Sequence, residues 1–383
     1  MSETTLRPIG QSALATALIF LSCTAWSDND HGDAARSYSV RPLVSDGALP
    51  ADHMDPSLRN SWGIAFNPNG AVWVADNKTN VATLYDGTGT KVNLGSFPEV
   101  HLPTGSNGDA APTGIVFNSS SDFTISPPGV PGQGGPPAPS VFIFAGENGT
   151  IMGWSPTLSL GNAFVAYDDK NGGAIYKGLA LAQNGQGNFL YATDFHNGKI
   201  DVFDRTFTRV TLTGTFKDSD LPQGYAPFGI RNIQGDLYVT FAKQDANRQD
   251  DVRGAGFGFV DVFDANGSLI RRIATRGSLN APWGLALAPA DFGQFSDRLL
   301  VGNFGDGTID AFDPATGASL GQLHATSGQV LKIDNLWGLS FGNGVLGQPT
   351  NSLFFTSGPG AEQHGLYGRI DAANSDDHDP SAD

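Results

Sequence analysis

A short apolar phrase centred on one glycine recurs six times along this chain. It reads NSWGIAF from residue 60, APTGIVF from 111, IYKGLAL from 175, APFGIRN from 226, APWGLAL from 281 and NLWGLSF from 335. The shared glycines recur every 51 to 64 residues, at Gly63, Gly114, Gly178, Gly229, Gly284 and Gly338. Repeats of about 40 to 50 residues that hold several strands each are typical of β-propeller blades. The sequence therefore predicts an all-β fold, a six-bladed β-propeller.

The same order of segments follows each glycine. An apolar strand such as VWVAD or LLVGN comes next, and then a third strand such as KIDVFD or TIDAFD, which often ends in an Asp that opens a turn. The 50 glycines and the low share of charged residues, 16%, suit many short strands joined by tight turns. The innermost strand of a blade lies where backbones crowd, so we expect the repeat glycine to permit a close approach that a Cβ would block.

The last repeat lacks a fourth strand after residue 370. We expect residues 37–44, SYSVRPLV, to supply it and to close the ring. The propeller would then span residues 37–370, and residues 371–383 would form a disordered acidic tail. Two segments interrupt the repeats. Residues 119–140 lie between the first two strands of the second blade, and residues 242–256 lie between the second and third strands of the fourth.

The N-terminus has the anatomy of a signal peptide. Arg7 precedes the apolar run ALATALIFLSC, which is short for a membrane span, so residues 1–27 are expected to direct export and residues 28–36 to form a polar linker. FLSC resembles a bacterial lipobox, and two outcomes stay open for Cys23: lipidation or removal with the signal. The protein would reach the periplasm, the outer membrane surface or the extracellular space, with membrane contact only through such a lipid anchor.

Charge excludes one class of partner. The formal net charge is -16, from 38 acidic and 22 basic residues, and no cluster of Lys or Arg interrupts it. Such a surface repels phosphate backbones, so no nucleic acid is expected as a partner. A small molecule, a glycan or a protein remains as the partner, and cations are compatible with the charge.

Long phrases in the C-terminal half carry a resemblance to one group of proteins. FAKQDANRQDDVRGAGFGFVDVFDANGSL, DNLWGLSFGNG and EQHGLYGRI resemble an uncharacterised family of exported bacterial proteins built as NHL-like six-bladed propellers, some with a C-terminal sorting anchor. The resemblance covers residues 38–370 and implies the fold and export, but no reaction. The end of this chain lacks the apolar helix and basic residues of such an anchor.

Polar loops are the first candidates for a ligand site. In a propeller, the loops between strands two and three share one face with the starts of the inner strands and ring the mouth of the channel. From these loops we predict as ligand-binding residues Lys243, Asp245, Asn303, Asp306, Glu362 and His364. Asp194, Asp245 and Asp306 are the candidates for a Ca²⁺ site, since Ca²⁺ takes oxygen ligands from several loops. The alternative is that these residues only form tight turns.

The residues before the repeat glycines are the second set of candidates. Lys177, Trp283 and Trp337 stand in equivalent positions, where they would form a stacking surface for a sugar or another flat ligand, or simply pack between blades. No catalytic residue is identified, because signatures such as HExxH and GxSxG are absent from the sequence. The first hypothesis is an exported ligand-binding or protein-interaction module. The alternative is a divalent-metal-dependent hydrolase or lyase with its site at the channel mouth, and whether the protein is an enzyme stays open.

Overall fold

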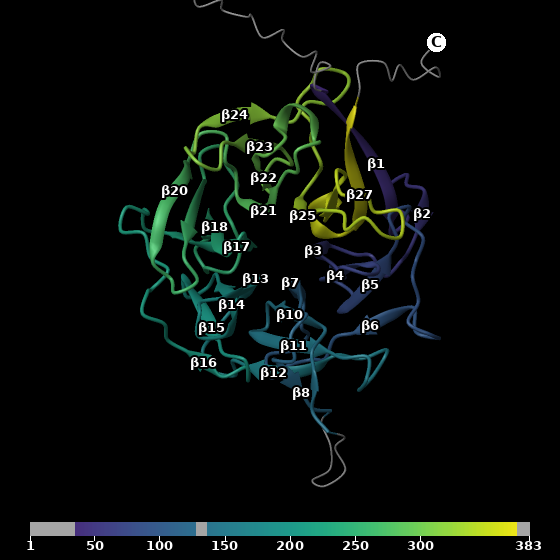
Figure 1. Cartoon of the computed structure of the whole chain (residues 1–383), viewed down its shortest axis with the longest axis vertical. Coiled ribbons are helices and arrows are strands. Elements are labelled where there is room, and N and C mark those ends of the chain that lie inside the picture. Colours follow the sequence, from purple (N-terminus) through teal and green to yellow (C-terminus); the bar gives the residue numbers. More distant parts are fainter. Residues whose placement is uncertain (1–34, 128–135, 374–383) are drawn as a thin grey trace, which may run out of the picture. The chain divides into compact units, whose positions relative to one another are not determined.

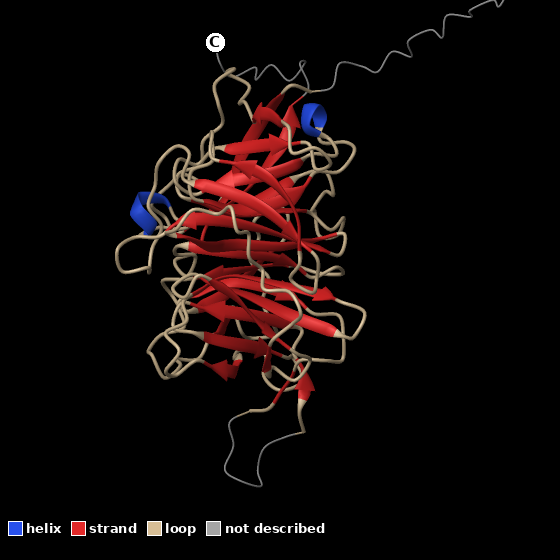
Figure 2. Ribbon diagram, turned by 90° about the vertical axis from the view of Figure 1, so that its left-hand side faces the viewer, coloured by secondary structure: helices blue, strands red, loops and turns tan. Residues whose placement is uncertain are grey.

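A computed structural model of the chain describes residues 35–127 and 136–373. Figure 1 shows six sheets arranged around a common centre. Figure 2 shows that strands dominate, and the helical segments of the described residues are short: the 3-10 turn η1 (Gly293–Phe295) and α1 (Pro359–Glu362). The predicted all-β, six-bladed β-propeller is confirmed.

Each blade is an antiparallel sheet whose strands follow one another from the centre outward. Blade one holds β3 (Ser61–Phe66), β4 (Val72–Asp76), β5 (Val81–Tyr85) and β6 (Glu99–His101). Blade two holds β7 (Pro112–Phe117), β10 (Phe142–Gly146), β11 (Thr150–Trp154) and β12 (Phe164–Asp168). Blade three holds β13 (Tyr176–Gln183), β14 (Asn188–Asp194), β15 (Lys199–Phe203) and β16 (Arg209–Val210).

The second half of the ring repeats this order. Blade four holds β17 (Tyr225–Ile233), β18 (Asp236–Lys243), β19 (Gly258–Phe263) and β20 (Leu269–Thr275). Blade five holds β21 (Pro282–Leu287), β22 (Leu299–Asn303), β23 (Ile309–Phe312) and β24 (Ser319–Gln322). Blade six holds β25 (Leu336–Phe341), β26 (Leu353–Ser357), β27 (Leu366–Ala373) and the N-terminal β1 (Ser37–Ser45), with β2 (His53–Met54) parallel to β1 at its edge.

The repeat glycines lie where neighbouring inner strands meet. A Cβ placed on Gly229 would lie 2.1 Å from the carbonyl oxygen of Trp283, and one on Gly284 would lie 2.5 Å from that of Trp337. Real Cβ atoms do not approach so closely, and the other four repeat glycines abut the next inner strand in the same way. The glycine therefore allows the six inner strands to contact one another in a ring.

The chain start closes this ring. β1 pairs antiparallel with β27 from Ser37 opposite Ala373 to Ser45 opposite Leu366, so the predicted closure is confirmed. β27 continues to Ala373, past the predicted end of the propeller at residue 370. Tyr38 also fixes β1 to blade five, because its buried hydroxyl donates to the carbonyl of Phe292 at 3.1 Å.

Both interruptions occur where the sequence placed them. Residues 119–140 carry the small sheet of β8 (Thr124–Ile125) and β9 (Ala138–Pro139) between β7 and β10. Residues 244–257 lie between β18 and β19, because β18 continues to Lys243. The outermost strands are the least visible in the sequence, and β6 and β16 are only three and two residues long. Outer strands bury little surface, so their apolar pattern is weak.

Several sequence expectations fall outside the described ranges. These are the signal peptide 1–27 with Cys23, most of the linker 28–36, and the tail beyond residue 373. Within the described residues, no helix has the length and apolar character needed to cross a membrane.

Candidate functional site

An aromatic layer closes the channel at the ends where the inner strands begin. Trp62, Phe228, Trp283 and Trp337, each just before a repeat glycine, gather there with Phe195 and Phe304 from the loops between strands two and three. Trp337 lies between Trp62 and Phe304, with ring centroids at 3.6 and 3.7 Å, and is 1% exposed. Trp337 therefore fills the channel and offers no free ring face, which corrects the expected stacking surface at this residue.

Lys177 occupies the equivalent position in blade three, where the other blades carry mostly aromatic residues. Its side chain is 2% exposed, and its Nζ lies 2.5 Å from Glu147 Oε1 and 3.4 Å from Asp250 Oδ1. Burial alone would lower the pKa of Lys177, but the charges of Glu147 and Asp250 outweigh it and raise that pKa. Burial would raise the pKa of Glu147, but the Lys177 charge outweighs it and lowers that pKa. Both groups therefore stay ionised at neutral pH.

A chain of amides continues from this ion pair. Asn77 donates to Glu147 Oε2 at 2.9 Å, and Asn60 donates to Asn77 Oδ1 at 3.2 Å and to Glu362 Oε2 at 3.1 Å. Trp337 Nε1 donates to Asn60 Oδ1 at 3.0 Å, which ties the chain to the aromatic layer. The polar groups thus lie directly over the aromatic rings.

Blade four contributes the remaining charges. Arg253 Nη2 lies 3.9 Å from Glu362 Oε1, and its guanidinium stacks 4.3 Å from the ring of Phe304. Arg253 Nη1 donates to Asn335 Oδ1 at 2.8 Å. We call this set the mouth network; its members are Asn60, Asn77, Glu147, Lys177, Asp250, Asp251, Arg253, Asn335 and Glu362.

Two buried polar atoms at the mouth have no hydrogen-bond partner. They are Asp251 Oδ2 and Trp62 Nε1. Burial raises the pKa of Asp251 to about 6, against the opposing charges of Arg253 and Lys177. Burial and then the charge of Glu147 raise the pKa of Glu362. Acids with shifted pKa values beside unsatisfied polar atoms are a mark of ligand and catalytic sites.

Some of the predicted ligand residues meet at this mouth and others do not. Lys177, Glu362, Trp283 and Trp337 come together, with Trp283 Nε1 donating to the carbonyl of Lys177 at 2.9 Å. Three others have local partners elsewhere: His364 Nδ1 lies 2.9 Å from Asp46, Lys243 lies over the ring of Phe257, and the buried Asn303 bonds Asp310.

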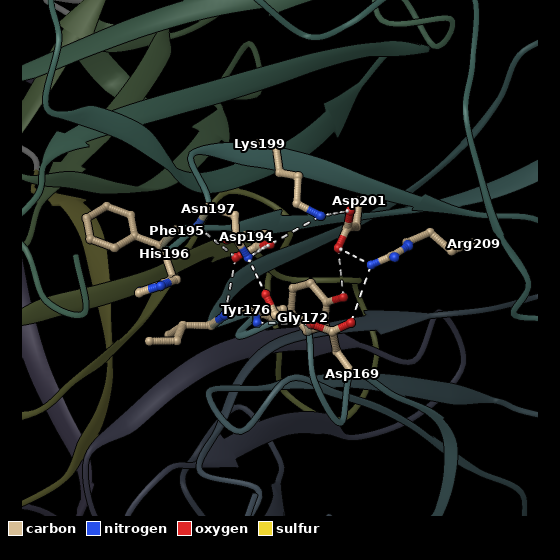
Figure 3. Close-up of polar contacts among 12 residues, drawn as sticks. Asp169, Gly172, Tyr176, Asp194, Phe195, His196, Asn197, Lys199, Asp201 and Arg209 are labelled. Atoms are coloured by element: carbon tan, nitrogen blue, oxygen red, sulfur yellow. Dashed lines mark hydrogen bonds and ion pairs between the residues drawn. The ribbon is translucent and has the colours of Figure 1, made fainter. Parts of the chain in front are cut away.

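The three predicted Ca²⁺ ligands come from blades three, four and five and do not converge. Asp194 belongs to a network of blade three with Asn197, Lys199 and Asp201 (Figure 3). Asp245 accepts the backbone N–H of Gln249, and Asp306 accepts the hydroxyl of Thr308. Each of the three carboxylates forms hydrogen bonds within its own loop, as expected if these residues form tight turns. Among residues 35–127 and 136–373, no group of three or more His, Cys, Asp or Glu side chains could hold a metal ion.

The main omissions from the predicted site are Glu147, Asp251, Arg253 and Asn60. Asp251 and Arg253 share the loop between β18 and β19, whereas Glu147 follows β10 and Asn60 precedes β3, so spacing along the chain gives no hint that all four meet. One signal was present: Asn60 and Asn335 both stand three residues before a repeat glycine, and only an alignment of the repeats with one another makes that visible.

Solved structures with a similar fold are remote in sequence. A protein of unknown function from Bacteroides thetaiotaomicron matches with a TM-score of 0.55 and 11% identity, over 88% of this chain and 76% of that one. A streptogramin B lyase matches with a TM-score of 0.51 and 16% identity, over 89% of this chain and all of that one. At such identities the likeness shows the fold alone.

Sequence relatives are closer, although no family model matches the chain. One uncharacterised protein of Acanthamoeba polyphaga mimivirus is 35% identical over 344 residues, which cover 88% of this chain and 81% of that protein. A second from the same virus is 36% identical over 314 residues, covering 80% and 79%. These relatives are viral, so they lend no support to the bacterial and exported character that the resemblance implied. The chain belongs to the family of these uncharacterised mimivirus proteins.

Proposed function

We propose that the protein is an exported ligand-binding propeller whose mouth network holds a small hydroxyl-rich molecule, such as a sugar. The observation that carries this proposal is the pair of buried, unpartnered atoms, Asp251 Oδ2 and Trp62 Nε1. One is an acceptor and the other a donor, and a hydroxyl group can satisfy both kinds. Lys177 interacts with the charge of Asp251, and its Nζ is 5.1 Å from the Trp62 ring centroid, so both groups flank the same lysine.

The charges at the mouth favour a neutral ligand over an anion. The four carboxyl groups of Glu147, Asp250, Asp251 and Glu362 outnumber the cations near them, which are Lys177, Arg253 and, beside Glu147, Lys78. Carboxylates accept hydrogen bonds from the hydroxyl groups that a sugar supplies. Asp250 is 68% exposed and Arg253 is 42% exposed, so both are accessible from solvent.

The raised pKa of Asp251 favours a second candidate, a hydrolase or lyase with its site at this mouth. A carboxyl group with a pKa of about 6 can both take and give a proton near neutral pH, as general acid–base catalysis requires. Glu362, whose pKa is also raised, would be the partner acid. In this candidate Asp251 acts on a proton of the bound molecule instead of only accepting a hydrogen bond.

Calorimetric titration of the full chain with glucose, galactose and mannose tests the binding proposal. We expect saturable binding of one sugar, weakened about tenfold or more in Asp251→Asn and Glu362→Gln, because a lost hydrogen bond to a charged group costs about 1.5 to 3 kcal/mol. Asp313→Asn, in the turn between β23 and β24 of blade five, is the matched control outside the mouth network and should bind like wild type. Proton NMR of the same mixtures separates the two candidates: a chemical change that Asp251→Asn abolishes favours the enzyme. Absence of binding, or equal binding in all variants, contradicts the proposal.

A further inference from the structure

A cavity of about 400 Å³ lies on the other side of the aromatic layer from the mouth network. All six inner strands line it with the residues that follow their repeat glycines, including Ile64, Ile115, Leu285 and Leu339. Residues further along these strands, such as Phe66 and Phe117, are only half-buried. The cavity is therefore open to solvent at the end where the inner strands lead into the second strands of the blades.

Arg231 is the only charged residue in the described lining of this cavity. Its backbone belongs to β17 of blade four, and its side chain extends to blade six. There Nη1 donates to the carbonyl of Leu339 at 2.7 Å and Nη2 donates to Ser340 Oγ at 3.0 Å. Across residues 35–127 and 136–373, no carboxylate forms an ion pair with it. A guanidinium has five N–H donors, so more than half of them stay available to a ligand.

Several arginines of this acidic chain pair with carboxylates, whereas Arg231 lines a cavity without one. Acidic residues outnumber basic ones by 38 to 22, and the half-buried Arg272 pairs with both Asp218 and Asp261. Burial lowers the pKa of Arg231 to about 10, so the guanidinium is still charged at neutral pH. A charge held in apolar surroundings without a counter-ion is costly, and an anion in the cavity would relieve that cost.

We infer that this cavity binds a small organic anion, a carboxylate with an apolar body, whose carboxylate group meets Arg231 inside the channel. The volume lies within the range of small-molecule pockets, about 300 to 1,000 Å³. The aliphatic lining suits an apolar body, and the planar guanidinium suits a carboxylate. This site is separate from the mouth network, because the aromatic layer lies between them and the excess of carboxylates at the mouth disfavours anions.

Titration of the full chain with benzoate, benzamide and inorganic phosphate tests the inference. Benzoate carries both the charge and the apolar body, benzamide lacks the charge, and phosphate lacks the apolar body. We expect saturable binding of one benzoate per chain, and binding about tenfold or more weaker for both other probes. Phosphate binding as tight as that of benzoate would overturn the assignment to an organic anion. Benzamide binding as tight as that of benzoate would overturn the role of the charge.

Two variants attribute the binding to this cavity. Arg231→Met should weaken benzoate binding about tenfold or more, whereas Arg209→Met, at an arginine of the outermost strand of blade three, should leave it unchanged. Leu181→Trp fills the cavity without removing the charge and should also abolish binding, which keeps the test valid if Arg231→Met fails to fold. Benzoate binding that survives both Arg231→Met and Leu181→Trp, or no benzoate binding by wild type, overturns the inference. Neither result bears on the proposed sugar binding at the mouth, which is tested separately.

Discussion

At the scale of single residues, Lys177 has the most distinctive surroundings. Four other blades have an aromatic residue at its position, and blade two has Thr113. Lys177 is almost fully buried among rings and carboxylates. Its charge is tolerated only because Glu147 and Asp250 are close. Such a buried charge makes the stability of the whole channel mouth depend on one ion pair.

Lys177→Met tests this dependence. Removing the lysine leaves the half-buried Glu147 without its nearest cation, so we expect the free energy of unfolding to fall by about 2 kcal/mol. The double variant Lys177→Met with Glu147→Gln should recover part of that loss. Arg41→Met is the control, because Arg41 is 54% exposed and pairs with Asp52, which is 38% exposed, at the surface. Urea unfolding measures all four proteins, and equal losses in both single variants would contradict the prediction.

A second residue, Asp261, makes the stability of the protein depend on pH. It is fully buried in blade four, where burial raises its pKa to about 6 although Arg272 opposes the shift. Its carboxyl binds a proton more tightly in the folded chain than in the unfolded chain. Its contribution to stability is therefore complete below about pH 4, the ordinary pKa of Asp, and is lost as the pH rises through about 6.

We accordingly expect the free energy of unfolding to fall between pH 4 and pH 7. Asp261→Asn should make this fall shallower, whereas the exposed Asp297→Asn should leave it as in wild type. Urea unfolding at several pH values in this range is the measurement. A wild-type stability that rises over the whole range, or an unchanged slope in Asp261→Asn, would show that burial does not control this carboxyl group.

At the scale of elements, the pairing of β1 with β27 decides whether the ring closes. Without β1, the outer edge of β27 would expose its backbone N–H and C=O groups, and the buried Tyr38 would leave the core it shares with blade five. Deletion of residues 28–45 should lower the melting temperature sharply or cause aggregation. Deletion of residues 374–383 is the control at the other terminus and should change little. An unchanged melting curve for the first deletion would rule out closure by this strand.

The inner strands carry the second prediction at this scale. Gly284→Val places side-chain atoms against the backbone of Trp337, so we expect a loss of about 2 kcal/mol or more in the free energy of unfolding. Gly187→Val is the matched control, because a Cβ at Gly187 meets no atom within 4 Å. A similar effect of both substitutions on thermal or urea unfolding would mean that the loss is not caused by crowding between blades.

At the scale of the whole molecule, the ring keeps the three predicted Ca²⁺ ligands apart. Asp194, Asp245 and Asp306 hold turns in three blades, so we expect Ca²⁺ to leave the melting temperature unchanged. Differential scanning calorimetry with CaCl₂ or with EDTA, at equal ionic strength, tests this. A rise with CaCl₂ that grows with its concentration would reveal a binding site and would favour the metal-dependent hydrolase or lyase of the sequence hypothesis.

The same ring gives the channel two chemically different ends. The mouth network brings together side chains from five blades and is rich in carboxylates, whereas Arg231 is the only charged residue in the described lining of the cavity beyond the aromatic layer. Neither end can be predicted from a single repeat, because each is assembled from residues of different blades that are far apart in the sequence.

The sequence by itself determined the six blades, the glycine at each inner strand and the closure by β1. These features recur along the chain, and an apolar strand pattern or a required glycine is visible locally. It also indicated Lys177 as an exception to the aromatic positions. Only the tertiary structure decided that Lys177 meets Glu147 and Asp250, that Trp337 is covered, and that Arg231 stands without a carboxylate. These facts depend on distances between blades, which a closed ring sets and which separation along the chain does not encode.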